Sequence, residues 1–162
     1  MSTEINLRVL LKSRPKGFPT KDDFDVVEST IPQPQQGEIL LQSLWLSLDP
    51  YMRGRMNDAK SYAPSVNIGD PMVGGSVAKV IESRSPVFKP GDIVEGRFGW
   101  QSYALSNGLD VRKVDESLAP LQTAVGVLGM PGLTAYFGFL DVCDPTPGDT
   151  VVVSAASGAV GQ

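Results

Sequence analysis

The feature that most constrains the fold is a run of small residues that directly follows a strongly apolar segment near the end of the chain. Residues 151–153 are three consecutive valines, and the sequence then continues SAASGAVGQ. Consecutive β-branched residues are typical of a strand that is buried on both faces of a parallel sheet. In the following turn, Ala155, Gly158 and Gly161 have the spacing A-x-x-G-x-x-G. This combination predicts a strand, a tight turn and the start of a helix.

The same spacing is that of a dinucleotide-binding fingerprint with alanine at its first small position. The first small residue permits the tight turn, Gly158 lets the backbone approach a pyrophosphate, and Gly161 lets the helix pack against the strand. The helix would present free N–H groups and its positive dipole end to the phosphates. We therefore predict that Ser157, Gly158, Ala159, Val160 and Gly161 bind a cofactor. The alternative is an ordinary glycine-rich turn after a strand.

Most of the chain before this turn has the pattern of short β-strands. Apolar runs bounded by glycine and proline predict strands over residues 8–13, 24–29, 38–48 and 72–83. In the third run, Ile39, Leu41 and Trp45 would share one face. Pro-Gly-Asp precedes two apolar runs, at residues 90–92 and 147–149, and is typical of a type II turn that leads into a strand.

The pattern changes after Asp115, where apolar residues at helical spacing predict helical segments over residues 118–129 and 132–142. Many strands, then a helix, a strand and a glycine turn, indicate two domains. We place a mainly β domain over residues 1–120 and the truncated start of an α/β Rossmann domain over residues 121–162. The uncharged run at 117–140 has the length of a membrane span. Its prolines and glycines instead indicate two short buried segments, so no membrane partner is expected.

Several classes of function are excluded by composition. The chain has no histidine and one cysteine, which argues against histidine-based catalysis and nearly every zinc site, so no metal is expected. Cys143 cannot form an internal disulfide, which favours a cytoplasmic location. The net charge of -4, with scattered basic residues, argues against nucleic-acid binding.

Longer motifs carry a resemblance to a known family. They are LSLDPYMRGRM at residues 46–56, GMPGLTAY at 129–136, and the valine strand with its glycine turn. With these motifs the chain resembles the zinc-independent medium-chain dehydrogenase/reductase superfamily, specifically its alkenal and prostaglandin (leukotriene B4 12-hydroxydehydrogenase-like) reductase branch and the bacterial NADPH-dependent curcumin reductases. The resemblance implies a GroES-like barrel followed by the start of an NADP-binding Rossmann domain, so that the chain is an N-terminal fragment. Zinc-dependent relatives have ligands near the positions of Ser47 and Gly75.

The resemblance also implies a substrate pocket in the β domain. Tyr51 would donate a hydrogen bond to a substrate carbonyl, and Arg53 would either fix a loop or bind a phosphate. Alternatively, Arg53 pairs with Asp49 while Tyr51 packs on the barrel. Phe98 and Trp100 alternate around a glycine, so they would share one strand face as a flat apolar wall for a conjugated substrate. The alternative is a pair of core residues.

For the cofactor, the resemblance places Met130 near the nicotinamide ring and Thr134 near its carboxamide or ribose. The alternative is a helix-entry turn with Pro131 at the first helical position. The catalytic residues and those that select NADP over NAD are expected beyond Gln162.

The resemblance implies a homodimeric, NADPH-dependent reductase that reduces the activated C=C bond of α,β-unsaturated ketones or aldehydes. The present chain by itself is predicted to be inactive. Two alternatives stay open, namely an NADPH quinone reductase of the same superfamily and a non-enzymatic GroES-like interaction module.

Overall fold

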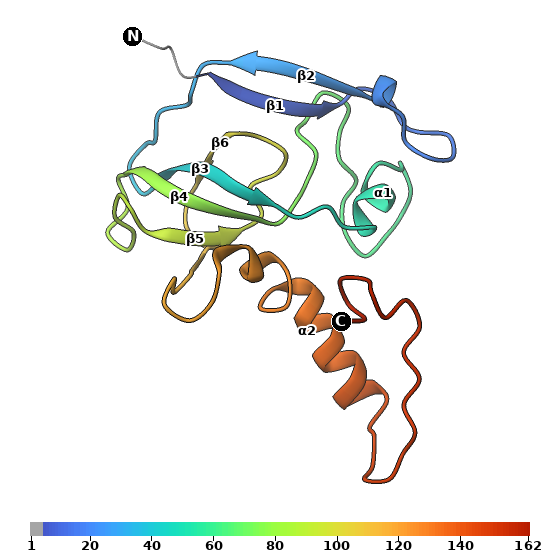
Figure 1. The fold of residues 1–162 in the computed structure, drawn as a ribbon. Helices are drawn as coiled ribbons and strands as arrows, with labels where there is room; N and C mark the ends of the chain where they lie inside the picture. Colours follow the sequence, from blue (N-terminus) through green and yellow to red (C-terminus); the bar gives the residue numbers. More distant parts are fainter. Residues whose placement is uncertain (1–4) are drawn as a thin grey trace. The chain divides into compact units, whose positions relative to one another are not determined.

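The computed structural model describes residues 5–162, which form two compact units (Figure 1). The first unit ends at Val114, and the second runs from Asp115 to Gln162. The first unit therefore ends six residues before residue 120, where the sequence analysis places the end of the β domain.

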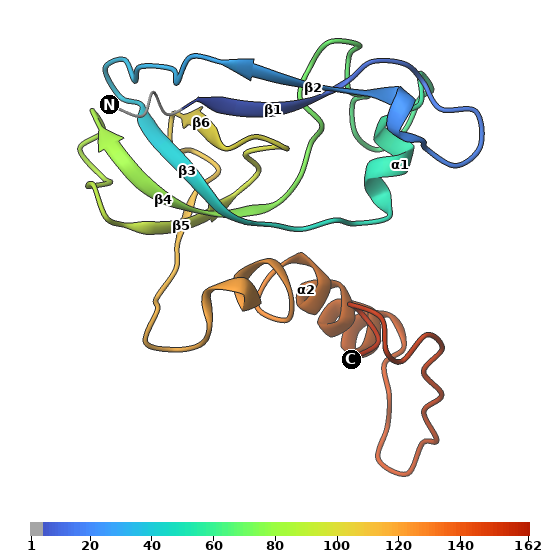
Figure 2. The same cartoon turned by 45° about the horizontal axis from the view of Figure 1, so that its top comes forward.

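The first unit is built from antiparallel strands, as the prediction of a mainly β domain requires. Its larger sheet has five strands in the order β6-β3-β4-β5-β7. These strands are β3 (Ile39–Leu46), β4 (Ser76–Ser83), β5 (Ile93–Gly96), β6 (Tyr103–Ser106) and β7 (Arg112–Lys113). A separate hairpin pairs β1 (Asn6–Leu11) with β2 (Phe24–Ser29), and the two strands run side by side in both views (Figures 1 and 2). Isolated bridges join this hairpin to Gln101 and Pro71.

The main core of this unit lies inside the larger sheet, where alternate residues of each strand point inward. On β4, for example, Ala78 and Val80 are buried while Lys79 between them is exposed. The cluster contains Ile39, Leu41, Ala78, Val80, Phe88, Val94, Phe98 and Ala104. Trp45 was predicted to share a face with two of these residues, but its register is shifted relative to β4 and it is 48% exposed.

A second apolar cluster holds the short helix α1 (Tyr51–Arg55) against the end of β1. Its buried members are Leu11, Met52, Met56, Val66 and Met72. Met52 and Met56 lie one helical turn apart, so they share one face and anchor the helix through it. A single turn of 3-10 helix, η1 (Lys21–Asp23), lies between β1 and β2.

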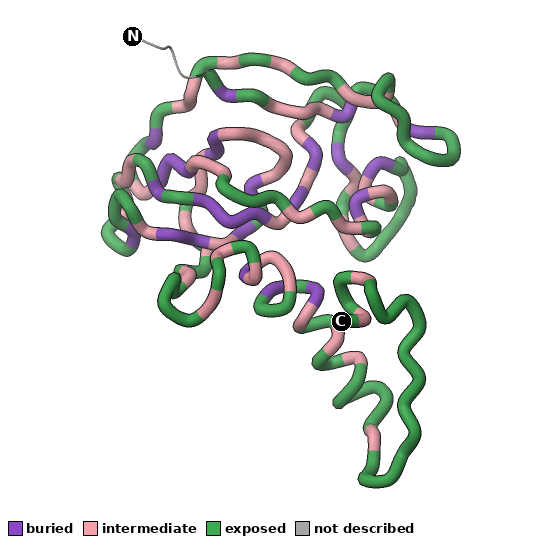
Figure 3. Tube along the Cα trace, in the orientation of Figure 1, coloured by how far each residue is buried: buried purple, intermediate pink, exposed green. Residues whose placement is uncertain are grey.

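The second unit contains η2 (Leu121–Val125), α2 (Met130–Phe137) and a π-helical turn, η3 (Gly138–Val142). The helix predicted at 132–142 is therefore present as α2 and η3, with proline in its first turn. The segment predicted to be helical at 118–129 contains only the short 3-10 helix η2. The predicted strand at 151–153 is wrong, because these valines are unpaired and at least half exposed. A parallel strand exists only when neighbours accept its hydrogen bonds, and none lies beside it in residues 5–162. Accordingly, most of this unit is coloured as exposed in Figure 3.

Within residues 5–162, no helix combines the length and the apolar character needed to cross a bilayer.

Candidate functional site

Tyr51 begins α1 and lies at the border of the second apolar cluster. Its phenol is partly buried, and this burial, followed by the nearby charge of Asp49, raises the pKa of Tyr51 above its ordinary value. A phenol is protonated at neutral pH in any case, and the raised pKa only extends this to more alkaline pH, so the hydroxyl can donate a hydrogen bond. Tyr51 can therefore act as a donor, and its role toward a substrate stays a prediction.

Arg53, on the same helix, fixes a loop. Its Nε donates to the Gly17 carbonyl at 2.9 Å, and a terminal nitrogen donates to the Pro15 carbonyl at 3.0 Å. The other terminal nitrogen donates to Oδ1 of Asn57 at 2.6 Å. The alternative ion pair with Asp49 is not among the salt bridges found in the described part of the chain.

Phe98 and Trp100 do not share a strand face, and that prediction is wrong. Phe98 is buried in the main core, whereas Trp100 packs against the second cluster and stacks on Phe24 with ring centroids 5.7 Å apart. Neither residue is in a strand. Gly99 between them has a φ of +75°, which breaks the alternation and turns the two side chains toward different clusters. Tyr51 and Trp100 therefore border one cluster, and Phe98 does not.

The glycine turn closes tightly on itself. Ala155 has a φ of +49°, and its carbonyl accepts the Gly158 N–H at 2.8 Å. The Gln162 N–H donates to the Gly158 carbonyl at 3.2 Å, which is the spacing of a first helical turn. A β-carbon on Gly161 would overlap the Ala155 carbonyl oxygen and lie 2.9 Å from Cα of Ala156. This contact explains why the last position of the motif has no side chain.

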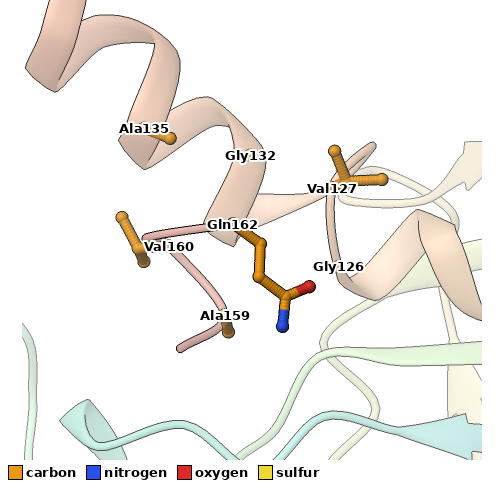
Figure 4. Close-up of a pocket in the computed structure, with 7 residues that line it drawn as sticks. All are labelled: Gly126, Val127, Gly132, Ala135, Ala159, Val160 and Gln162. Atoms are coloured by element: carbon orange, nitrogen blue, oxygen red, sulfur yellow. The ribbon is translucent and has the colours of Figure 1, made fainter. Parts of the chain in front are cut away.

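A pocket of about 290 Å³ lies within the second unit, between α2 and the glycine turn (Figure 4). Its walls are small or apolar apart from one amide, and they comprise Gly126, Val127, Gly132, Ala135, Ala159, Val160 and Gln162. The structure thus brings the predicted residues Ala159 and Val160 together with the first turns of α2. In the described part of this turn, the N–H groups of Ala159, Val160 and Gly161 have no backbone acceptor.

Met130 and Thr134 are not among the residues that line this pocket. They lie one turn apart on α2, and the Thr134 hydroxyl donates to the Met130 carbonyl at 2.8 Å. Gly132 and Ala135 occupy the pocket face instead. A β-carbon on Gly132 would overlap the Val127 carbonyl oxygen, so the helix and the preceding loop are in direct backbone contact there.

Sequence reasoning missed the remaining lining residues, Gly126, Val127, Gly132, Ala135 and Gln162. From the sequence alone, the glycines around Pro131 indicate only breaks in an apolar run. Their clustering beside a proline was the available signal, because glycines that do not form turns often mark close backbone approach.

Ser47 and Gly75 occupy the places where zinc-dependent relatives are expected to have ligands, and they are neighbours here. The Ser47 N–H donates to the Gly75 carbonyl at 2.9 Å. Across residues 5–162, no three side chains of His, Cys, Asp or Glu gather closely enough to hold a metal ion.

Known proteins are similar to this chain along nearly its whole length. It is 49% identical to the NADPH-dependent curcumin reductase of Escherichia coli, over 96% of this chain and 45% of that protein. It is 44% identical to an NADP(+)-dependent 2-alkenal reductase of Nicotiana tabacum, over 100% of this chain and 49% of that protein. The chain spans about half the length of these relatives.

Solved structures also share this fold over nearly the whole chain. The structure of CurA from Vibrio vulnificus in complex with NADPH is 51% identical and superposes with a TM-score of 0.90, over 96% of this chain and 46% of that one. The family model for the N-terminal domain of oxidoreductases matches residues 8–114, which make up nearly all of the first unit. The chain therefore belongs to this oxidoreductase family, within the medium-chain dehydrogenase/reductase superfamily.

Proposed function

We propose that this chain is the N-terminal part of an NADPH-dependent reductase that acts on the activated C=C bond of α,β-unsaturated ketones and aldehydes. The observation that carries the proposal is the 49% identity to a curcumin reductase, which extends over 96% of the chain. That stretch includes both the helix with Tyr51 and most of the second unit. We use the term extended protein for a protein of about the length of the relatives that contains this chain.

In this proposal, Tyr51 donates a hydrogen bond to the carbonyl oxygen of the substrate. The electron density that develops on this oxygen during reduction makes the hydrogen bond stronger in the transition state than in the ground state. As a phenol, Tyr51 keeps its donor proton at neutral pH. Trp100, which packs on the same cluster, supplies apolar surface beside it.

The second unit fits the phosphates of a dinucleotide. The N–H groups of Ala159, Val160 and Gly161 are free to donate to phosphate oxygens, and Gly161 brings the start of the helix against the turn. Bound NADPH would supply the hydride. The glycine turn would position the phosphates, and the pocket beside α2 would hold another part of the cofactor.

The test is NADPH oxidation by the extended protein, with a simple enone present and then absent. Enone-dependent oxidation, reduced about tenfold or more by Tyr51→Phe, is the expected result. The matched control is Tyr62→Phe, since Tyr62 is an exposed phenol on the segment after α1 and is 85% exposed.

Other outcomes would point elsewhere. Oxidation with quinones but not with enones would contradict the substrate class and favour a quinone reductase. Absence of NADPH binding in the extended protein would contradict the enzyme and favour a GroES-like interaction module.

A further inference from the structure

We infer that Arg14 and Arg53 form a reciprocal clamp that positions Tyr51 by locking α1 to the loop after β1, so both are positioning residues for the reaction. The inference rests on the proposed function for one point only, which is that Tyr51 contacts the substrate. The clamp itself stands on hydrogen bonds and burial in the first unit.

The first half of the clamp runs from the helix to the loop. The Arg53 guanidinium reaches two carbonyls of the loop, those of Pro15 and Gly17, at 3.0 and 2.9 Å. Its remaining terminal nitrogen is oriented by Asn57, which lies just past the end of α1, at 2.6 Å. Because a guanidinium is planar and rigid, three simultaneous hydrogen bonds fix both its position and its direction.

The second half runs in the opposite direction. Arg14, on the loop, donates to the Met56 carbonyl at 2.8 Å. Met56 is the C-cap of α1, where helix carbonyls lack partners within the helix. The cation also lies at the negative end of the helix, which favours this placement. Each segment therefore supplies an arginine that donates to backbone carbonyls of the other segment.

The helix needs such external support because it is only five residues long. An isolated helix of this length is not stable in water, since its nucleation cost exceeds the gain from one or two hydrogen bonds. On one side, Met52 and Met56 are buried in the second cluster together with Leu11, the last residue of β1. The arginines hold the helix to the loop that follows Leu11, and Pro15 in this loop is itself buried.

Tyr51 is the residue that the clamp affects most directly. It starts α1, two positions before Arg53, and the charged groups that act on its phenol are Asp49, Arg97 and Arg55. A small rotation of α1 would move the hydroxyl relative to Asp49 and Arg97, which lie outside the helix. Displacements of about 1 Å at a catalytic group can lower rates by as much as about a hundredfold.

The experiment reads the position of Tyr51 without relying on activity. The 162-residue chain is labelled with 3-fluorotyrosine, which gives fluorine NMR signals for its four tyrosines, and Tyr51→Phe identifies one of them. Arg14→Ala and Arg53→Ala should each shift or broaden the Tyr51 signal while leaving those of Tyr103 and Tyr136 in place. The matched control is Arg84→Ala, which removes only an exposed arginine paired with Glu82.

A conservative variant separates geometry from charge. Arg53→Lys keeps the positive charge but cannot reach two carbonyls and Asn57 at once. The clamp predicts that its Tyr51 signal resembles that of Arg53→Ala, and a wild-type signal would overturn the clamp. If Arg53→Ala unfolds, all four signals collapse together. Asn57→Ala then serves instead, because it removes one exposed contact and should shift Tyr51 in the same direction by less.

Kinetics of the extended protein complete the test. The arginine variants should lower kcat/KM for an enone by about tenfold or more while leaving NADPH affinity unchanged. An unmoved Tyr51 signal in both alanine variants would overturn the inference whatever the activity. If the signal moves while the wild-type protein shows no enone turnover, the proposed function fails and the role in positioning Tyr51 stands.

Discussion

Asn6 and Tyr103, which are 97 positions apart in the sequence, exchange two hydrogen bonds. The Asn6 amide donates to the Tyr103 carbonyl at 2.9 Å, and its oxygen accepts from the Tyr103 N–H at the same distance. Asn6 is only 3% exposed. The side chain thus acts as an extra strand residue and holds the β1–β2 hairpin against β6.

Replacing this side chain should loosen the hairpin. Asn6→Ala removes both hydrogen bonds from a buried site, so we expect the free energy of unfolding to fall by about 1–3 kcal/mol. Urea unfolding of the chain measures this loss. The control is Asn107→Ala, at an exposed turn whose side chain accepts one local hydrogen bond, and it should change stability by about 0.5 kcal/mol or less. Equal losses of unfolding free energy in the two variants would show that the Asn6 side chain does not hold the hairpin against β6.

The adjacent residues Gly74 and Gly75 should respond differently to the same substitution. A β-carbon on Gly74 would lie 2.8 Å from Cδ1 of Leu46 and 3.2 Å from the Trp100 indole, whereas none of the surrounding atoms is within 4 Å at Gly75. We expect Gly74→Ala to destabilise the chain by about 1 kcal/mol, because the end of Leu46 can rotate away but the Trp100 indole is harder to displace, and Gly75→Ala to be nearly neutral. Thermal unfolding followed by circular dichroism compares the two variants, and the reverse order would show that the side chains of Leu46 and Trp100 do not limit the space at Gly74.

Much of the β unit could be predicted because its signals are local. The run at 24–29 coincides with β2, and the Pro-Gly-Asp turn ends at Asp92, just before β5 begins. In both places neighbouring residues alone determine the turn and the alternation. The family resemblance likewise depended on contiguous motifs.

What could not be predicted depends on residues distant in sequence. The separation of Phe98 from Trp100 follows from Gly99, which has a φ of +75°. A β-carbon on Gly99 would lie only 2.8 Å from the Met72 carbonyl oxygen. The hydrogen bonds of Arg53 join segments that lie 36 and 38 positions apart. Residues 151–153 have strand propensity, but a strand also needs neighbours, and propensity alone does not supply them.

Acid should weaken the first unit in part through Asp92. A hydrogen bond from Lys113, whose Nζ lies 2.8 Å away, and then one from the Lys89 N–H hold the pKa of Asp92 below its ordinary value. A lowered pKa in the folded state contributes stability that is complete above the unfolded pKa of about 3.9 and is lost as pH falls through the folded value.

Lys113→Met should therefore raise the pKa of Asp92 toward its ordinary value. The stability difference between variant and wild type should be largest near neutral pH and shrink as pH falls below about 4. Carbon NMR titration of the carboxyl groups measures the shift directly. The pKa of Asp149, which is lowered by the Thr146 N–H and hydroxyl, is the internal control and should not move. An unchanged pKa of Asp92 would show that Lys113 does not stabilise its charge.

Gly161 provides the sharpest test of the glycine turn. Its missing side chain leaves room for the Ala155 carbonyl oxygen, so Gly161→Ala must displace the turn or the start of the helix. We expect the extended protein to lose NADPH affinity by about tenfold or more, which corresponds to about 1.4 kcal/mol. Binding is measured by titration of NADPH fluorescence.

The matched control for that substitution is Gly138→Ala. Gly138 has helical dihedral angles of -61° and -40°, and none of the atoms around it would meet a β-carbon within 4 Å. Alanine is favoured over glycine in a helix, so this variant should keep its NADPH affinity and be as stable as the wild type or more so. If Gly161→Ala bound NADPH as tightly as Gly138→Ala, the close contact between Gly161 and Ala155 would not shape the cofactor site. The phosphates would then have to be held by groups outside residues 155–162.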